Sequence, residues 1–189
     1  MTTLAMATVL GLAAQCAPGV APDTIAAIAR VESGLEPLAI HDNTVQRTFQ
    51  SADLPEAVAL ATGLIVAQHH SVDLGLMQVN SANLARLGLS ITDAFDACRS
   101  IEAGGRVLSE AYQRALRGAL SAYNTGDPQR GISNGYVSRV EHAALSVPSI
   151  APGASAPPAR PQASPTAQAA ASWDVFAQSG GTPFVFTGK

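Results

Sequence analysis

Charged and aromatic side chains are scarce in this chain of 189 residues. Asp, Glu, Lys and Arg make up 13% of it and aromatic residues 5%, whereas charged residues are about 25% of an average globular protein. The net charge is −3, so no basic surface is expected and nucleic acid is not an expected partner. The chain also lacks the Gly-X-Y and heptad repeats of fibrous proteins. Its 47% apolar content argues against disorder throughout, and its many alanines favour closely packed helices.

Cysteine and cofactor motifs are also few. The chain has only Cys16 and Cys98, whose spacing excludes a CxxC redox or zinc site. Two buried thiols or one disulfide in an oxidising compartment both fit this spacing. No phosphate-binding glycine motif is present, so no cofactor is expected. No metal site is expected either, because the neighbouring His69 and His70 point in different directions and no HExxH motif follows.

The first fourteen residues are apolar, but a bilayer-spanning helix needs about 20 such residues. No stable membrane span is therefore expected here. A signal peptide would be atypical, because no Lys or Arg precedes the apolar run. The segment fits either the first helix of the domain or a degenerate export signal, and the export route stays open.

The composition changes near Ser146. Residues 146–189 hold seven of the twelve prolines and only three charged residues, a composition that cannot bury enough apolar surface to order itself. We therefore predict a domain over residues 1–145 and a Pro/Ala-rich tail over 146–189. The aromatic segment from Trp173 to Phe186 fits either a terminal docking motif or an incidental end of the tail.

The domain is expected to be mainly α-helical. Pro22 and Asp23 predict the start of a helix, with Asp23 as its cap, and this helix should end near Ser33 and Gly34. Residues 41–50 read as a loop or a weak hairpin. The remaining pattern predicts helices over residues 53–68, 81–87, 92 or 93 to 98, 99–115, 117–123 and 135–145. Two glycines at 104 and 105 are tolerable in a helix if another helix crosses closely there.

Glu32 is the best candidate for a catalytic residue. It ends a predominantly apolar helix, and an apolar wall favours the protonated carboxyl group that can donate to a leaving oxygen. Two further segments carry groups suited to sugars. Residues 75–80 form an apolar turn with two amides, and residues 122–126 combine a tyrosine with an amide.

Taken together, these segments resemble the lysozyme-like lytic transglycosylases. The matching sequences are ESGLEP (32–37), GLMQVN (75–80) and AYNTG (122–126). Four other stretches are similar to the transglycosylase component of type IV secretion and conjugation systems, namely CAP (16–18), LAIHDN (38–43), SVDLGLMQ (71–78) and NGYV (134–137). The resemblance covers roughly residues 4–145.

The resemblance implies a lysozyme-like domain that cleaves peptidoglycan in the periplasm, between N-acetylmuramic acid and N-acetylglucosamine. Glu32 would be the single catalytic acid and base, and the product would carry a 1,6-anhydromuramyl end. Ser33 would orient the acid. The other implied substrate-binding residues are Met77, Gln78, Asn80, Tyr123, Asn124 and Tyr136. A disulfide between Cys16 and Cys98 is implied too, and the tail would contact secretion components.

Two other readings fit the sequence. A muramidase on the same fold would need a second carboxylate, and Asp42 or Asp73 would have to face Glu32. A non-catalytic wall-binding module would work through its tail. Two departures from the family pattern also stand out. Glu36 replaces a common asparagine, and Thr125 replaces a common alanine.

Overall fold

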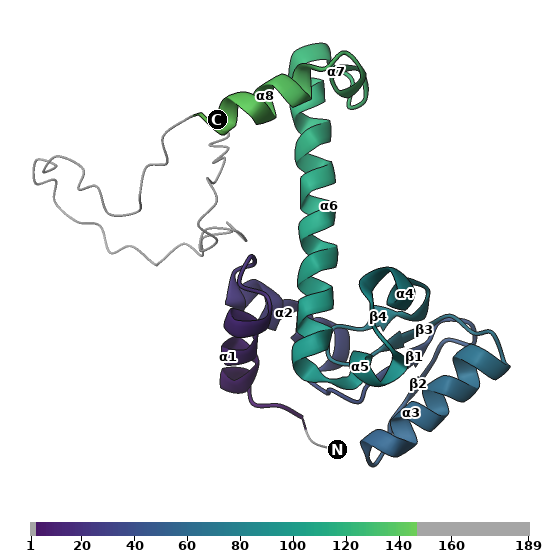
Figure 1. Ribbon diagram of the computed structural model, residues 1–189. Coiled ribbons are helices and arrows are strands. Elements are labelled where there is room, and N and C mark those ends of the chain that lie inside the picture. Colours follow the sequence, from purple (N-terminus) through teal and green to yellow (C-terminus); the bar gives the residue numbers. More distant parts are fainter. Residues whose placement is uncertain (1–2, 147–189) are drawn as a thin grey trace, which may run out of the picture. The chain divides into compact units, whose positions relative to one another are not determined.

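The computed structural model describes residues 3–146 of the chain (Figure 1). They form two compact units, the first ending at Tyr112 and the second beginning at Gln113. The predicted tail, including its aromatic segment, lies outside the described residues apart from Ser146. The boundary predicted after residue 145 therefore stays a prediction.

Helices dominate both units, as predicted. The first unit contains α1 (Met6–Cys16), α2 (Pro22–Ser33), α3 (Leu54–Thr62), the π-helical segment η1 (Gly63–Ala67), the 3₁₀ turn η2 (Ser81–Asn83), α4 (Leu84–Leu87) and α5 (Ile91–Phe95). The long helix α6 (Ala97–Thr125) begins in the first unit and ends in the second, which also contains α7 (Arg130–Ser133) and α8 (Tyr136–Ala144).

The first unit also contains a small antiparallel sheet. Its strands are β1 (Ile40–Asp42), β2 (Arg47–Phe49), β3 (Val72–Leu74) and β4 (Val79–Asn80), in the order β2-β1-β3-β4. The β1–β2 pair confirms the hairpin reading of residues 41–50. Strands β3 and β4 were not predicted, because two or three residues are too few to show an alternating pattern.

Side-chain caps fix the start of some of the helices. Asp53 caps α3 by accepting a hydrogen bond from the Glu56 N–H at 2.9 Å. The prediction that Asp23 caps α2 is wrong, because the helix begins at Pro22 with Ala21 as its cap. A proline suits the first helical position, since no N–H is needed there. The predicted start at residue 92 or 93 is also wrong, because Ser90 caps α5 through a reciprocal pair with Asp93.

Helix α6 joins two helices that we predicted to be separate, over 99–115 and 117–123. Its glycine pair allows two close contacts within the first unit. A Cβ atom on Gly104 would lie 2.7 Å from the Met77 side chain, and one on Gly105 would lie 2.8 Å from Ala17. The close approach predicted at this pair is therefore present, but the partners are a loop and the residue after α1 rather than a crossing helix.

The N-terminal apolar segment is part of the folded unit. Helix α1 packs against α2 (Figure 1), and its Val9 and Ala13 are fully buried. A disulfide joins Cys16 at the end of α1 to Cys98 at the start of α6, as the resemblance implied. Among the described residues, no helix has the length and apolar character needed to span a bilayer.

Candidate functional site

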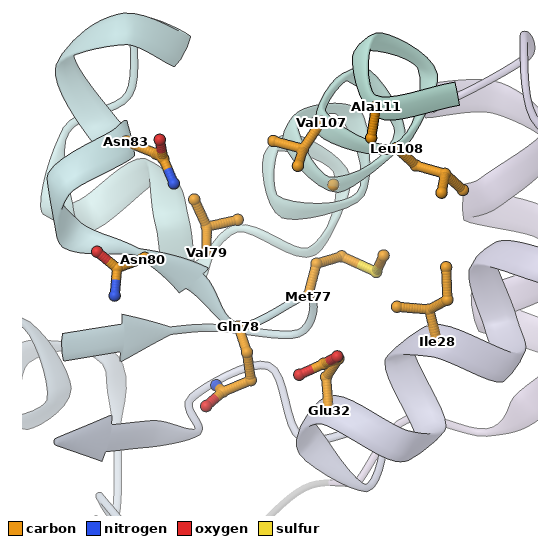
Figure 2. A pocket seen from close by; sticks show the side chains of 11 residues that line it. Ile28, Glu32, Met77, Gln78, Val79, Asn80, Asn83, Val107, Leu108 and Ala111 are labelled. Atoms are coloured by element: carbon orange, nitrogen blue, oxygen red, sulfur yellow. The ribbon is translucent and has the colours of Figure 1, made fainter. Parts of the chain in front are cut away.

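A pocket of about 340 Å³ opens between α2, the β3–β4 turn and α6, entirely within the first unit. Figure 2 shows Glu32, Met77 and Gln78 around it. Of the residues that line it, Glu32 is the only one with an ionisable side chain. The complete lining is Ile28, Glu32, Met77, Gln78, Val79, Asn80, Asn83, Gly104, Val107, Leu108 and Ala111.

Glu32 lies in the last turn of α2, which ends at Ser33 with Gly34 as its left-handed cap. Buried Ile25 and Ala29 fix one face of this helix in the core, while Ile28 and Glu32 line the pocket. The predicted apolar wall is present, yet the Glu32 residue itself is exposed. The protein alone therefore leaves this carboxyl group accessible to a substrate.

Gln78 lines the pocket and keeps one hydrogen-bond acceptor unused among the described residues. It adopts a positive φ of 46°, and its Nε2 atom donates to the carbonyls of Gly75 (2.9 Å) and Ala39 (3.3 Å). Both amide hydrogens are thus used within the protein. The Oε1 atom receives no hydrogen bond from the described residues, so it can accept one from an N–H or hydroxyl group of a ligand.

Asn80 lines the pocket but uses its amide to build the site. Its Nδ2 donates to Asp73 Oδ1 at 2.7 Å and to Ser71 Oγ at 3.0 Å, and its Oδ1 accepts from the Ala82 N–H at 3.0 Å. Both of its donors are therefore occupied within the protein, and its predicted contact with substrate stays a prediction. Its structural role is to cap η2 and to tie β4 to β3.

Ser33 connects two elements of the site. Its hydroxyl lies 2.8 Å from the Leu76 carbonyl and 2.9 Å from the Ala29 carbonyl. Ser33 does not belong to the pocket lining, and its predicted role toward the substrate stays a prediction. It instead anchors the end of α2, next to Glu32, to the turn that carries Met77 and Gln78.

The second unit contains the remaining predicted site residues, Tyr123, Asn124 and Tyr136. Tyr123 is 82% exposed and Asn124 is exposed as well. Tyr136 is half-buried at the start of α8, where its N–H donates to Asn134 Oδ1 at 2.9 Å.

Hydrogen bonds fix the turn that follows Tyr123 and Asn124. Thr125 Oγ1 lies 2.9 Å from the Ser121 and Asp127 carbonyls and accepts from the Asp127 N–H at 3.2 Å. The threonine that departs from the family pattern therefore stabilises this turn. Hydrogen bonds from the Gln129 and Arg130 N–H groups hold the pKa of Asp127 below its usual value.

Neither of the carboxylates that the alternative muramidase would need lines the pocket. Asp42 is fully buried and pairs with His70, with 2.6 Å between Oδ2 and Nδ1. Burial raises the pKa of Asp42, but hydrogen bonds from His70 and from the Thr44 and Val45 N–H groups outweigh it, and the net shift is downward. Asp73 accepts hydrogen bonds from Asn43 and Asn80. Both carboxylates thus belong to strands of the sheet and are hydrogen-bonded there.

The structure adds residues to the site that the sequence did not single out. Asn83 lines the pocket, and its side-chain amide makes no hydrogen bond with the other described residues. Val107, Leu108 and Ala111 form the α6 wall of the pocket. An amphipathic pattern shows which face of a helix is apolar, but not whether that face covers a core or a pocket.

The pocket thus combines one carboxylate with apolar and amide side chains in a mainly helical unit. The family described as transglycosylase SLT domain matches residues 10–144, and the chain belongs to this family. The mainly helical, lysozyme-like fold class predicted from the sequence is thereby confirmed. No solved structure matches the chain significantly.

Several relatives are called virB1. Protein virB1 of Rhizobium radiobacter is 47% identical over 145 residues, covering 72% of this chain and 60% of the relative. Protein virB1 of Agrobacterium fabrum is 40% identical over 173 residues, covering 87% and 68%. Type IV secretion system protein virB1 of Brucella suis is 40% identical over 129 residues, covering 62% and 54%. The chain spans only about 60% of the length of the first of these relatives. The identities confirm the predicted resemblance to the type IV secretion subgroup.

Proposed function

We propose that the chain is a peptidoglycan lytic transglycosylase with Glu32 as its single catalytic acid and base. The observation that carries this proposal is that Glu32 is the only ionisable residue in the pocket lining. Ordinary glycosidases use two carboxylates about 5–9.5 Å apart. A reaction that needs only one fits this pocket better.

In the proposed reaction, the protonated Glu32 carboxyl group gives its proton to the glycosidic oxygen between N-acetylmuramic acid and N-acetylglucosamine. The bond from this oxygen to the muramyl C1 then breaks, and the substrate's own N-acetyl group stabilises the intermediate. The Glu32 carboxylate next takes the proton of the muramyl C6 hydroxyl as that oxygen attacks C1. Glu32 ends protonated, no water is consumed, and the product is a 1,6-anhydro end.

The pocket supplies suitable contacts for such a glycan. Gln78 Oε1 is free to accept from an N-acetyl N–H or a hydroxyl group, and Asn83 can both donate and accept. The apolar side chains of Met77 and Ile28 lie beside Glu32 (Figure 2). A sugar ring bound against them would cover the exposed carboxyl group. Tyr123, Asn124 and Tyr136 of the second unit are proposed to contact further sugars.

The test is digestion of purified peptidoglycan followed by mass analysis of the products. Wild-type protein should release anhydro ends, which are lighter by one water than hydrolysed ends. Glu32→Gln should lower the rate by about 10²–10⁴-fold, the usual contribution of a general acid and base. Glu36→Gln is the matched control, because the only hydrogen bond of the Glu36 side chain to the described residues comes from Thr3 at 3.1 Å.

Two outcomes would replace the proposal. Hydrolysed ends from the wild type would identify a muramidase. Full function of Glu32→Gln, combined with loss of function when residues 146–189 are deleted, would identify a non-catalytic wall-binding module.

We also propose that the enzyme acts in the periplasm, where it opens the wall locally for a type IV secretion or conjugation apparatus. The support is the likeness to relatives named for that system. The tail, through residues 173–186, is proposed to bind secretion components. A pull-down from cells that carry such a system should recover them with the full chain and not with a chain that ends at residue 172. Equal recovery by both would reject the docking role.

A further inference from the structure

One peptide group beside the pocket is held from both sides. The carbonyl of Leu76 accepts a hydrogen bond from the Ser33 hydroxyl at 2.8 Å. The N–H of Met77 donates to Ser100 Oγ at 3.0 Å. This carbonyl and this N–H belong to the same peptide group. Helix α2 therefore holds one edge of the group and helix α6 holds the other.

Burial makes the bond to Ser100 hard to replace. Ser100 and Leu76 are fully buried, and Met77 is 7% exposed. A buried N–H that loses its partner cannot turn to water, so the loss costs more than the net value of an ordinary hydrogen bond. The Met77 N–H thus has a strong preference for the geometry in which Ser100 accepts from it.

The same face of α6 also receives the Met77 side chain. Gly104 lies one helical turn after Ser100, and residues four apart share a face of a helix. A Cβ atom on Gly104 would lie 2.7 Å from Met77 Cε and 3.0 Å from Met77 Cβ. The absence of a side chain at Gly104 is what allows Met77 to lie this close to α6.

The clamped peptide group connects two polar residues of the pocket lining, Glu32 and Gln78. Glu32 precedes Ser33 directly, and Gln78 follows Met77 directly. Gln78 has a positive φ and depends on the carbonyls of Gly75 and Ala39 to orient its amide. A rotation of the Leu76–Met77 peptide would therefore disturb the end of α2 and the Gln78 side chain together.

We propose that Ser100 is a positioning residue for the transglycosylase reaction, and this inference rests on the function proposed above. Ser100 does not line the pocket. It acts through the Leu76–Met77 peptide group, which aligns Glu32, by way of Ser33, with the acceptor oxygen of Gln78. The substrate positioned in this way is the peptidoglycan glycan strand.

The experiment compares Ser100→Thr with Ser100→Val, two side chains of the same shape that differ in the hydroxyl group. Cleavage of soluble peptidoglycan strands is measured over a range of concentrations. We expect Ser100→Val to turn over about tenfold more slowly than Ser100→Thr at saturating substrate, the effect of one misaligned hydrogen-bonded group. The concentration for half-saturation should change little, and the Met77 amide should exchange with solvent faster in the Val variant.

Further variants keep the test decisive. Ser100→Ala adds no atoms and replaces the pair if the extra methyl group of Thr and Val prevents folding. Ser109→Ala, which removes a hydroxyl that bonds only within α6 at 2.8 Å, is the matched control and should keep full turnover. Combining Ser33→Ala with Ser100→Ala should slow turnover less than the product of the single effects, because both changes release the same peptide group.

The possible failures can be told apart. Equal turnover of the Thr and Val variants, or a loss of turnover that only follows a loss of thermal stability, would overturn the role of Ser100 and leave the proposed function intact. A wild type that cleaves no more than Glu32→Gln would overturn the proposed function, and the role of Ser100 with it.

Discussion

Removal of the disulfide between Cys16 and Cys98 should destabilise the first unit strongly. The bond ties the end of α1 to the start of α6, and its cysteines are 82 residues apart in the sequence. For a loop of this length, the chain-entropy relation gives about 4.5 kcal/mol at 25 °C. Each kcal/mol of stability lost lowers the thermal midpoint by about 2–4 °C. The double variant Cys16→Ala/Cys98→Ala should therefore melt about 9–18 °C below the wild type.

The assay is urea and thermal unfolding, followed by circular dichroism, of the oxidised wild type and the double variant. Reductant is the internal control, because it should lower the midpoint of the wild type and leave the double variant unchanged. A difference below about 1 kcal/mol would refute the reasoning, since disulfide removal from a small domain usually costs about 2–5 kcal/mol. A wild type that does not respond to reductant would show that the bond is not formed.

Three other changes test separate parts of the structure. The pKa of Asp42 lies below the ordinary value of 3.8, so its ionised form adds stability above about pH 4 that is lost as the pH falls through the lowered pKa. Asp42→Asn should thus unfold more easily at pH 7 and depend less on pH between about 2 and 4. Gly75→Ala should destabilise by more than about 2 kcal/mol, because the new Cβ would lie 1.9 Å from the Ala94 carbonyl oxygen. Thr125→Val keeps the side-chain shape but loses the hydrogen bonds of the hydroxyl group. It should therefore lower the free energy of unfolding by about 1 kcal/mol.

Each of these has a control and a contrary result. If the stability of Asp42→Asn falls between about pH 4 and pH 2 as steeply as that of the wild type, other carboxylates cause that fall. Gly88 shares the positive φ of Gly75 but has open space around it, so Gly88→Ala is the control. If both alanine variants lose the same free energy of unfolding, the clash at residue 75 has no effect. Thr125→Ser keeps the hydroxyl and should remain close to wild type; a loss as large as that of the valine variant would contradict the hydrogen-bond explanation.

Local signals allowed much of the fold to be predicted. A proline and a glycine predicted α2 to within a residue or two, and these signals act within one turn of the chain. The cap predicted at Asp23 and the helix start predicted at residue 92 or 93 were wrong, because the cap positions belong to Ala21 and Ser90. The strands β3 and β4 were missed because their stability comes from pairing with β1 and with each other rather than from their own sequence.

The sequence by itself determined that Glu32 lies at the end of an apolar helix and that three short motifs occur in a family-specific order. Only the tertiary structure decided which groups are free to meet a ligand. The Asn80 amide donates to Asp73, whereas the Gln78 side-chain oxygen accepts no hydrogen bond from the described residues. Ser100 accepts a hydrogen bond from the Met77 N–H, 23 residues away in the sequence. The physical reason is that a hydrogen bond between distant residues depends on how helices and turns pack, and no local pattern in the chain records that packing.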